Sequence, residues 1–388
     1  MPDPKPDHPC IVIPGIQGTG LENIYALPPA GTWSTWQGVG QKLGDVDFDS
    51  LSLDDAAVVD DGETVVNRAS QLLGVAYQAF VQALRGRSDL PVYVFPYDWR
   101  YSNVRSANKL VQFVRALQQK RLRSLLPVNW DKTFDFACHS MGGLVFRQFL
   151  AAWTDGPPPV HRVVFIATPH LGSVDAVESM IRGETSLFGG QKELRKLART
   201  FPGVYELLPN PALPNTVIEN GAPVDFFNVN NWQQTVTPDP NDPDDFNVEQ
   251  PHLTAARGFI THLPQVAQPG GELAGQVLVI FGSGGETLRT VTVLPTFNGV
   301  TNWYDFDHAL NGDGDEVVPV DSARLDGVPS FEIPKGDVSI FNLKSHVLSL
   351  HALLPSLDEV SSVTSRFLSG VTGTSLVPKG TDPSRFHP

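Results

Sequence analysis

The stretch FACHSMGGLVF, residues 136–146, decides the fold class. A β-type apolar run, residues 133–137, ends in CHSMGG (138–143), and a helix-like pattern then begins. A sharp strand-to-helix turn of this kind strains its serine and holds the hydroxyl clear of the backbone, which requires small flanking residues. The pattern favours a nucleophile at Ser140 over an ordinary structural turn. It also places the N–H of Met141 at a helix N-terminus, where it can donate to an oxyanion.

Short apolar runs alternate with helix-period segments on both sides of this turn. Such an alternation predicts an α/β fold with a mostly parallel sheet that helices cover on both faces. A capping-box-like pair, Ser356 and Glu359, predicts the start of a last helix. The expected strands are 10–13, 92–95, 133–137, 163–167 and 277–281, and the expected helices include 67–84 and 102–125.

Composition excludes several classes of protein. With 28 basic and 42 acidic residues the chain carries a net charge of −14, which repels phosphate backbones, so we expect no nucleic-acid partner. No apolar run approaches the roughly 20 residues of a transmembrane helix. The opening residues lack the pattern of a signal peptide, which predicts a cytoplasmic protein with export by another route left open. Cys10 and Cys138 fit neither a disulfide framework nor a zinc spacing, and their apolar settings predict buried free thiols.

A serine nucleophile requires a histidine base that a carboxylate orients. In doubly wound hydrolases the acid and then the histidine follow the serine along the chain. The turn NGDGDEVVPVDSA (311–323) offers Asp313 and Asp315 as the acid, although an Asp/Gly turn is usually only structural. His346 and His351, before the last helix, are both candidates for the base.

A second oxyanion donor is expected in the loop after the first strand. The segment IPGIQG (13–18) supplies glycines and backbone N–H groups at that place. Either Ile16 or Gln17 can donate from its backbone.

Taken together, these motifs resemble the lecithin:cholesterol acyltransferase-like branch of the α/β-hydrolases, which includes phospholipases, acyltransferases and bacterial esterases. FPYDWR is the most distinctive of them, and the set runs in the family's order from about residue 10 to 360. The resembling stretches are IVIPGIQGTGLE (11–22), FPYDWR (95–100), ACHSMGG (137–143), ATPHLGS (167–173), YELLPNP (205–211), FGSGGET (281–287) and GDGDEVVP (312–319).

The resemblance sharpens the choice of site residues. It implies Asp315 as the acid, four positions before a proline, and His351 as the base, just before Leu-Leu-Pro. It implies Gln17 as the oxyanion residue beside Met141. Two departures stand out: Gln17 replaces a residue that is often apolar, and Cys138 replaces the usual glycine of the elbow.

The fold and function implied are those of a serine hydrolase that cleaves carboxylic esters through an acyl-enzyme and needs no cofactor or metal. The alternative is an acyltransferase that gives the acyl group to an alcohol; a lactone hydrolase or a non-catalytic binding protein is less favoured. We expect a small-molecule or lipid ester as substrate. The expected organisation is a core of residues 1–173 and 273–369, a cap or lid at 174–272 with a disordered loop at 237–252, and a flexible tail at 370–388.

Overall fold

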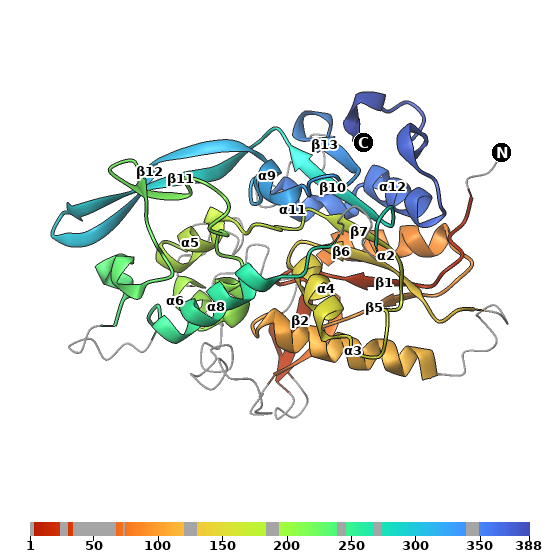
Figure 1. The fold of residues 1–388 in the computed structure, drawn as a ribbon, viewed down its shortest axis with the longest axis horizontal. Helices are drawn as coiled ribbons and strands as arrows, with labels where there is room; N and C mark the ends of the chain where they lie inside the picture. Colours follow the sequence, from red (N-terminus) through yellow and green to blue (C-terminus); the bar gives the residue numbers. More distant parts are fainter. Residues whose placement is uncertain are drawn as a thin grey trace.

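A seven-stranded sheet forms the centre of the computed structural model, which describes residues 4–23, 30–33, 67–72, 74–119, 130–183, 194–238, 246–266, 273–338 and 349–388 (Figure 1). All neighbouring strands are parallel except the last pair, β13 and β14. The α/β-hydrolase fold expected from the sequence is confirmed. The strand order is β14 (Phe386–His387), β13 (Ser330–Pro334), β10 (Val277–Ser283), β7 (Val160–Ile166), β6 (Phe134–His139), β1 (Cys10–Ile13) and β5 (Val92–Val94).

Helices cover both faces of this sheet because successive strand residues point to opposite sides. Phe136 and Cys138 of β6 join one buried cluster, to which helices α3 and α4 contribute. Ala137 joins the other, to which α2 and α12 contribute. The helices are α2 (Gly74–Gly86), α3 (Asn103–Gln119), α4 (Met141–Ala152), α5 (Val174–Ile181), α6 (Leu194–Ala198), α7 (Pro202–Tyr205), α8 (Gln250–His262), α9 (Val320–Ala323), α11 (Leu350–Leu353) and α12 (Asp358–Leu368).

A long hairpin forms a second sheet with the inserted segment. Strands β11 (Gly285–Phe297) and β12 (Val300–Gly314) pair antiparallel, and β11 also pairs with β8 (Val217–Glu219), which in turn pairs with β9 (Ala222–Pro223). The hairpin projects from the main body (Figure 1). Residues from both sides of the expected boundary at 273 thus share one sheet, and the division into core and cap stays a proposal.

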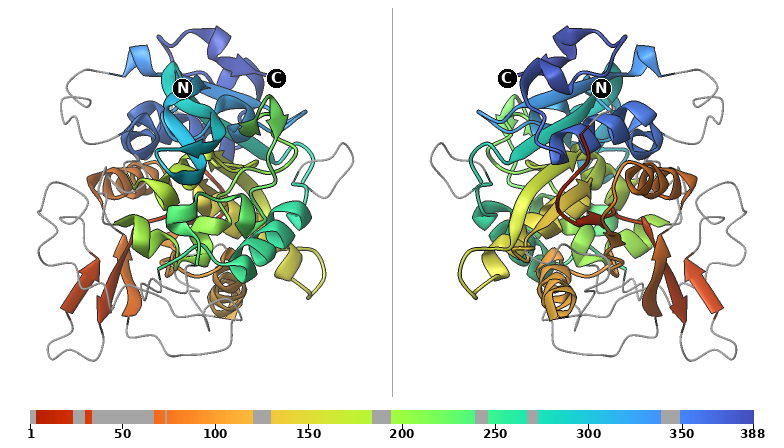
Figure 2. Two further views of the ribbon diagram at one scale, coloured as in Figure 1. Left: turned by 90° about the vertical axis from the view of Figure 1, so that its left-hand side faces the viewer. Right: turned by 90° about the vertical axis from the view of Figure 1, so that its right-hand side faces the viewer.

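A third, smaller sheet lies away from the C-terminal helices (Figure 2). Its strands are β3 (Ala30–Trp33), β2 (Thr19–Asn23) and β4 (Asn67–Leu72). The helix expected over 67–84 is therefore wrong at its start, where residues pair with β2, and right from Gly74 onward.

Two further expectations differ from the structure. Leu357, not Ser356, precedes α12, and the hydroxyl of Ser356 donates to Leu353 O at 2.6 Å, so the capping box does not form. The tail expected at 370–388 is instead held on the molecule: Leu376 is buried, β14 pairs with β13, and Arg385 forms ion pairs with Glu359 and Asp337. Residues 239–245 of the loop expected at 237–252 lie outside the described residues, and Gln250 already begins α8.

Short 3₁₀ turns complete the chain, at η4 (Val229–Asn231), η5 (Gln234–Val236), η6 (Lys335–Asp337), η7 (Leu354–Ser356), η8 (Gly373–Leu376) and η9 (Pro383–Arg385). In the described part of the chain, no helix has the length and apolar character that crossing a membrane requires.

Candidate active site

Ser140 occupies the turn between β6 and α4 in a strained conformation. Its φ of 52° and ψ of −130° lie outside the regions that non-glycine residues usually adopt. The backbone fixes this geometry, because Ser140 N–H donates to Ile166 O at 2.9 Å and Ser140 O accepts from Gly143 N–H at 3.0 Å. The turn has the strand–serine–helix form that the sequence predicts for a nucleophile.

The two glycines after Ser140 are required by close packing. A Cβ on Gly142 would lie 2.5 Å from the carbonyl oxygens of Ile13 and Pro14, and one on Gly143 would lie 2.1 Å from Thr168 Oγ1. Real Cβ atoms do not approach other atoms so closely. The missing side chains therefore let the elbow pack directly against the end of β1 at Gly142 and against Thr168, which follows β7, at Gly143.

A hydrogen-bonded chain joins the three expected triad residues. His351 Nε2 lies 2.8 Å from Ser140 Oγ, and His351 Nδ1 lies 2.8 Å from Asp315 Oδ2. All three residues are buried, with exposed fractions of 4 % for Ser140, 7 % for His351 and 1 % for Asp315. The sequence separates Ser140 from His351 by 211 positions, and the parallel sheet brings them together.

The turn after β12 holds Asp315 rigidly. Its Oδ1 accepts from the backbone N–H groups of Val317 at 3.1 Å and Val318 at 2.7 Å, which leaves Oδ2 for His351. A Cβ on Gly282 of β10 would lie 2.7 Å from Asp315 Cβ, so this glycine makes room for the acid.

Glu316 and the backbone position the histidine. Glu316 Oε2 accepts from Leu350 N–H at 2.7 Å, and its Oε1 accepts from Lys335 Nζ at 2.8 Å. His351 N–H also donates to Asp315 O at 3.0 Å. The start of α11 is thus tied to the acid turn at two successive residues.

The loop after β1 lies directly against the serine. A Cβ on Gly15 would lie 2.8 Å from Ser140 Cβ, and Gly18 N–H closes a turn onto Gly15 O at 3.1 Å. Gln17 in this turn has a φ of 59°. Its Nε2 is buried and has no hydrogen-bond partner among the described residues, while Ile16 is half-buried and packs against the core.

The FPYDWR motif braces this loop at both ends. Tyr97 Oη donates to Pro14 O at 2.9 Å, and Trp99 Nε1 donates to Thr19 O at 3.0 Å. Asp98 and Arg100 form a buried bidentate pair, with Arg100 Nε 2.9 Å and Nη2 2.7 Å from the carboxylate. The motif therefore acts on loop geometry, and none of these contacts involves Ser140, His351 or Asp315.

The remaining candidates lie elsewhere. Asp313 is exposed, and its carboxylate accepts from Gly284 N–H at 2.6 Å. His346 lies outside the described residues. Cys138 is a fully buried free thiol in β6, where burial raises its pKa well above the ordinary value, so it is no thiolate nucleophile.

His139 and Tyr77, which the sequence did not indicate as site residues, connect His351, the serine elbow and the loop after β1. His139 Nε2 lies 3.1 Å from His351 O, and since a carbonyl only accepts, Nε2 carries the proton. His139 Nδ1 then accepts from Tyr77 Oη at 2.5 Å, and that oxygen accepts from Gly15 N–H at 2.8 Å. Burial lowers the pKa of His139 well below its usual value, which keeps the ring neutral and this pattern fixed.

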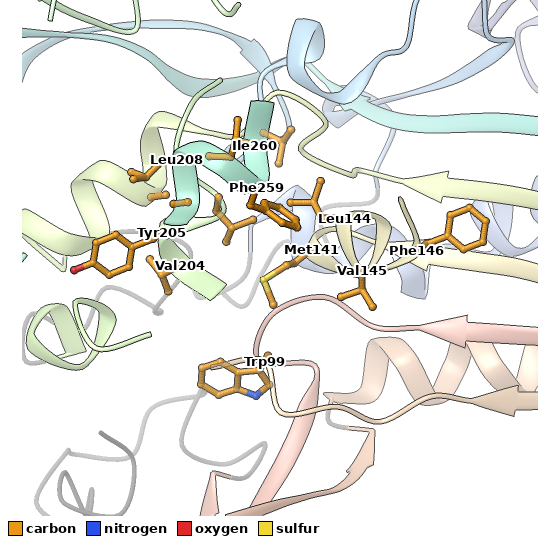
Figure 3. Close-up of a cluster of buried hydrophobic side chains, with 14 of the residues drawn as sticks. Trp99, Met141, Leu144, Val145, Phe146, Val204, Tyr205, Leu208, Phe259 and Ile260 are labelled. Carbon is orange, nitrogen blue, oxygen red and sulfur yellow. The ribbon is translucent and has the colours of Figure 1, made fainter. Parts of the chain in front are cut away.

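Apolar side chains of the inserted segment pack against the elbow helix (Figure 3). Met141 and Leu144 of α4 lie close to Phe259 of α8, and Val204 of α7 belongs to the same buried cluster. This cluster packs hydrocarbon against α4, the helix that follows Ser140.

One protein family has a sequence model that matches part of the chain. The sequence model of the lecithin:cholesterol acyltransferase family matches residues 74–248, which include FPYDWR and the serine elbow but not the loop after β1 or the acid turn. No curated protein sequence matches the chain.

Several solved structures also match the chain. A crystal structure of a Tle4–Tli4 complex has a TM-score of 0.59 at 16% identity, covering 94% of this chain and 97% of that chain. The lipase BlEst2 of Bacillus licheniformis in mature form has a TM-score of 0.36 at 12% identity, covering 92% and 89%. Lipase 1 from Pelosinus fermentans has a TM-score of 0.36 at 11% identity, covering 91% and 98%. The first likeness bears on the fold alone.

The family match confirms the resemblance drawn from the motifs and supports an acyl-transferring hydrolase. Together with the parallel sheet and the strained elbow, it describes a chain of the α/β-hydrolase fold that is similar to the lecithin:cholesterol acyltransferase family over residues 74–248.

Proposed function

We propose that the protein is a serine hydrolase that cleaves carboxylic esters through an acyl-enzyme. One observation carries the proposal: the chain of 2.8 Å contacts from Ser140 through His351 to Asp315 at the strained elbow. Such an arrangement allows a serine hydroxyl to act as a nucleophile at neutral pH.

Each residue has a distinct role in the proposed reaction. Ser140 Oγ attacks the acyl carbonyl while His351 Nε2 takes its proton. Asp315 accepts from Nδ1–H and stabilises the imidazolium that forms. His351 then returns the proton to the leaving alcohol, and water, activated by the same nitrogen, releases the acid.

The oxyanion is held by two backbone donors. Met141 is the first residue of α4, and the N–H groups of a helix's first turn have no partner within the helix. Gln17 lies in the turn that packs against Ser140. We propose these two N–H groups as the oxyanion hole, which in other hydrolases contributes about 100- to 1,000-fold to kcat per donor.

The burial of the triad favours a second candidate, acyl transfer to an alcohol. Transfer requires that water reach the acyl-enzyme slowly, and Ser140 and His351 are both more than nine-tenths buried. Adding an alcohol acceptor and measuring how the product divides between acid and new ester separates the two activities.

The test is hydrolysis of chromogenic esters of rising acyl length by the wild type and Ser140→Ala. We expect loss of at least about 10,000-fold in kcat in the variant. Asp315→Asn should lose activity too, whereas Asp313→Asn, its neighbour on the same turn, should retain it. Full activity in Ser140→Ala overturns the proposal, and loss in Asp313→Asn alone reassigns the acid.

A further inference from the structure

A second group of titratable side chains lies at the opposite end of the sheet from Ser140. His8 precedes β1, Asp135 is near the start of β6, and His161 is near the start of β7. Because these strands are parallel, their amino ends share one edge, whereas Ser140 follows the carboxyl end of β6. This group therefore stands apart from the proposed catalytic chemistry.

Three potential metal ligands converge there. Single ligand atoms of Asp7, His8 and His161 all lie within 4.8 Å of one another. The rings of His8 and His161 stack with centroids 3.6 Å apart. His8 Nδ1 also lies 2.8 Å from Asp7 Oδ1, and its Nε2 lies 3.5 Å from Asp131.

Asp135 provides an independent observation that points to a cation. It is fully buried, and its Oδ1 accepts from His161 Nδ1 at 2.9 Å. Its Oδ2 is buried with no hydrogen-bond partner in the described part of the chain. A buried carboxylate requires a compensating positive charge. The imidazole of His161 can supply that charge as a proton or a metal, and His8 and Arg162 also stabilise the carboxylate electrostatically.

In many metal sites a carboxylate outside the coordination sphere accepts a hydrogen bond from a metal-bound histidine and orients its ring. Asp135 and His161 make the same kind of contact. With Nδ1 directed at Asp135, His161 presents Nε2 as the ligand atom. Two imidazoles and a carboxylate suit zinc and similar transition metals, while calcium and magnesium prefer oxygen ligands alone.

We propose that Asp7, His8 and His161 bind a divalent transition-metal ion of the zinc class, with Asp135 as the outer carboxylate. In a tetrahedral zinc site with ligands at about 2.0–2.2 Å, ligand atoms lie closer together than 4.8 Å. The stacked rings must also part so that their lone pairs converge. His161 is anchored on β7, so the closing movement belongs to Asp7 and His8, which precede β1.

Titration calorimetry of the full chain with ZnCl₂ tests the proposal. We expect one zinc ion per chain and a zinc-dependent rise in Tm. His8→Ala and His161→Ala should each weaken binding at least tenfold, and Asp135→Asn should weaken it about 10- to 100-fold. His308→Ala, which removes an exposed histidine beside Asp305, is the matched control and should bind zinc as the wild type does.

His8→Ala guards against a folding artefact, because His8 lies outside the sheet, and circular dichroism should show it folded. Absence of zinc binding by the wild type overturns the proposal. Zinc binding by His8→Ala and His161→Ala that is as tight as that of the wild type also overturns it. A Tm that follows pH but not zinc also overturns it, because protons then supply the charge that Asp135 requires.

Discussion

At the scale of single residues, His139 and Tyr77 connect His351, the turn at Ser140 and the loop after β1. Their hydrogen bonds run from His351 O through the neutral ring of His139 and the hydroxyl of Tyr77 to Gly15 N–H. The base, the nucleophile's neighbour and the oxyanion loop are thus held in one fixed pattern. We interpret the pair as positioning residues, since neither one is part of the Ser140–His351–Asp315 chain.

We predict that Tyr77→Phe lowers kcat by roughly 2- to 10-fold with little change in KM. Removing one hydroxyl leaves His139 Nδ1 and Gly15 N–H without their partner, and a hydrogen bond of this kind contributes about 0.5–1.5 kcal/mol. Steady-state kinetics on a short-chain ester measures the change. Tyr304→Phe, which removes a buried hydroxyl bonded to Asn231 O in the inserted part, is the control. Equal kcat in Tyr77→Phe and the wild type would contradict this role.

The sequence predicts the three residues of the proposed triad but not those that position them. A serine between a β-type run and two glycines has a local signature, and the resemblance selects Asp315 and His351. Tyr77 lies 62 positions from His139, so no local pattern connects them. His139 carried a weak signal, as a polar residue at the end of a buried strand next to the nucleophile.

At the scale of elements, the approach of α4 to the loop after β1 depends on a missing side chain. A Cβ on Gly142 would lie 2.5 Å from two backbone carbonyl oxygens, which cannot rotate away as a side chain can. We predict that Gly142→Ala lowers the free energy of unfolding by about 1–3 kcal/mol and reduces esterase activity.

The matched control is Gly258→Ala, because Gly258 lies inside α8 and a Cβ there would meet nothing within 4 Å. Alanine should stabilise that helix by up to about 1 kcal/mol. Urea denaturation of both variants measures the contrast. If Gly142→Ala proves as stable and active as the wild type, the elbow can accommodate a Cβ at this position and the prediction is wrong.

A buried carboxyl group holds the start of α3. Glu206 accepts from Asn103 N–H at 2.6 Å and from Ser102 Oγ at 2.5 Å, and burial raises its pKa to about 7. In the unfolded chain the pKa is about 4.3. The folded state therefore binds the proton of Glu206 more tightly than the unfolded chain does. The contribution of protonated Glu206 to the free energy of unfolding is complete below about pH 4.3 and is lost as pH rises through 7.

We predict that the wild type loses on the order of 3 kcal/mol of stability between pH 4.5 and 8 through Glu206, and that Glu206→Gln does not. Urea unfolding across this range should find the variant gaining relative to the wild type as pH rises. Glu286→Gln, at an exposed position of β11, is the control. If the difference in free energy of unfolding between the wild type and Glu206→Gln stays constant with pH, Glu206 does not titrate as predicted.

Five of the seven strands of the central sheet could be predicted because buried parallel strands are short apolar runs, and β13 and β14 are not among them. The hairpin β11–β12 could also have been found, since Asn298 and Gly299 at its turn both have positive φ and Asn-Gly is a strong hairpin signal. Strand β4 could not, because residues 67–72 contain no alternating pattern and are strand-like only through pairing with β2. Strand β14 depends likewise on Arg385 and its distant carboxylate partners.

At the scale of the whole molecule, the net charge of −14 affects how the protein binds to a charged lipid surface that carries a substrate. An acidic protein is repelled by anionic headgroups over distances comparable to the Debye length, about 10 Å at 0.1 M salt. We therefore expect adsorption, and not the chemistry proposed for Ser140, to limit the rate on anionic vesicles.

We predict faster hydrolysis of an ester embedded in zwitterionic vesicles than in anionic vesicles at about 0.01 M salt, with the difference shrinking as salt is raised to about 0.5 M, where the Debye length falls below 10 Å. A soluble uncharged ester provides the control, because its rate should not follow ionic strength. Faster hydrolysis on anionic vesicles at low salt would mean that a local basic surface, and not the overall charge, directs docking. The salt dependence would then have the opposite sign, because screening would weaken an attraction in place of a repulsion.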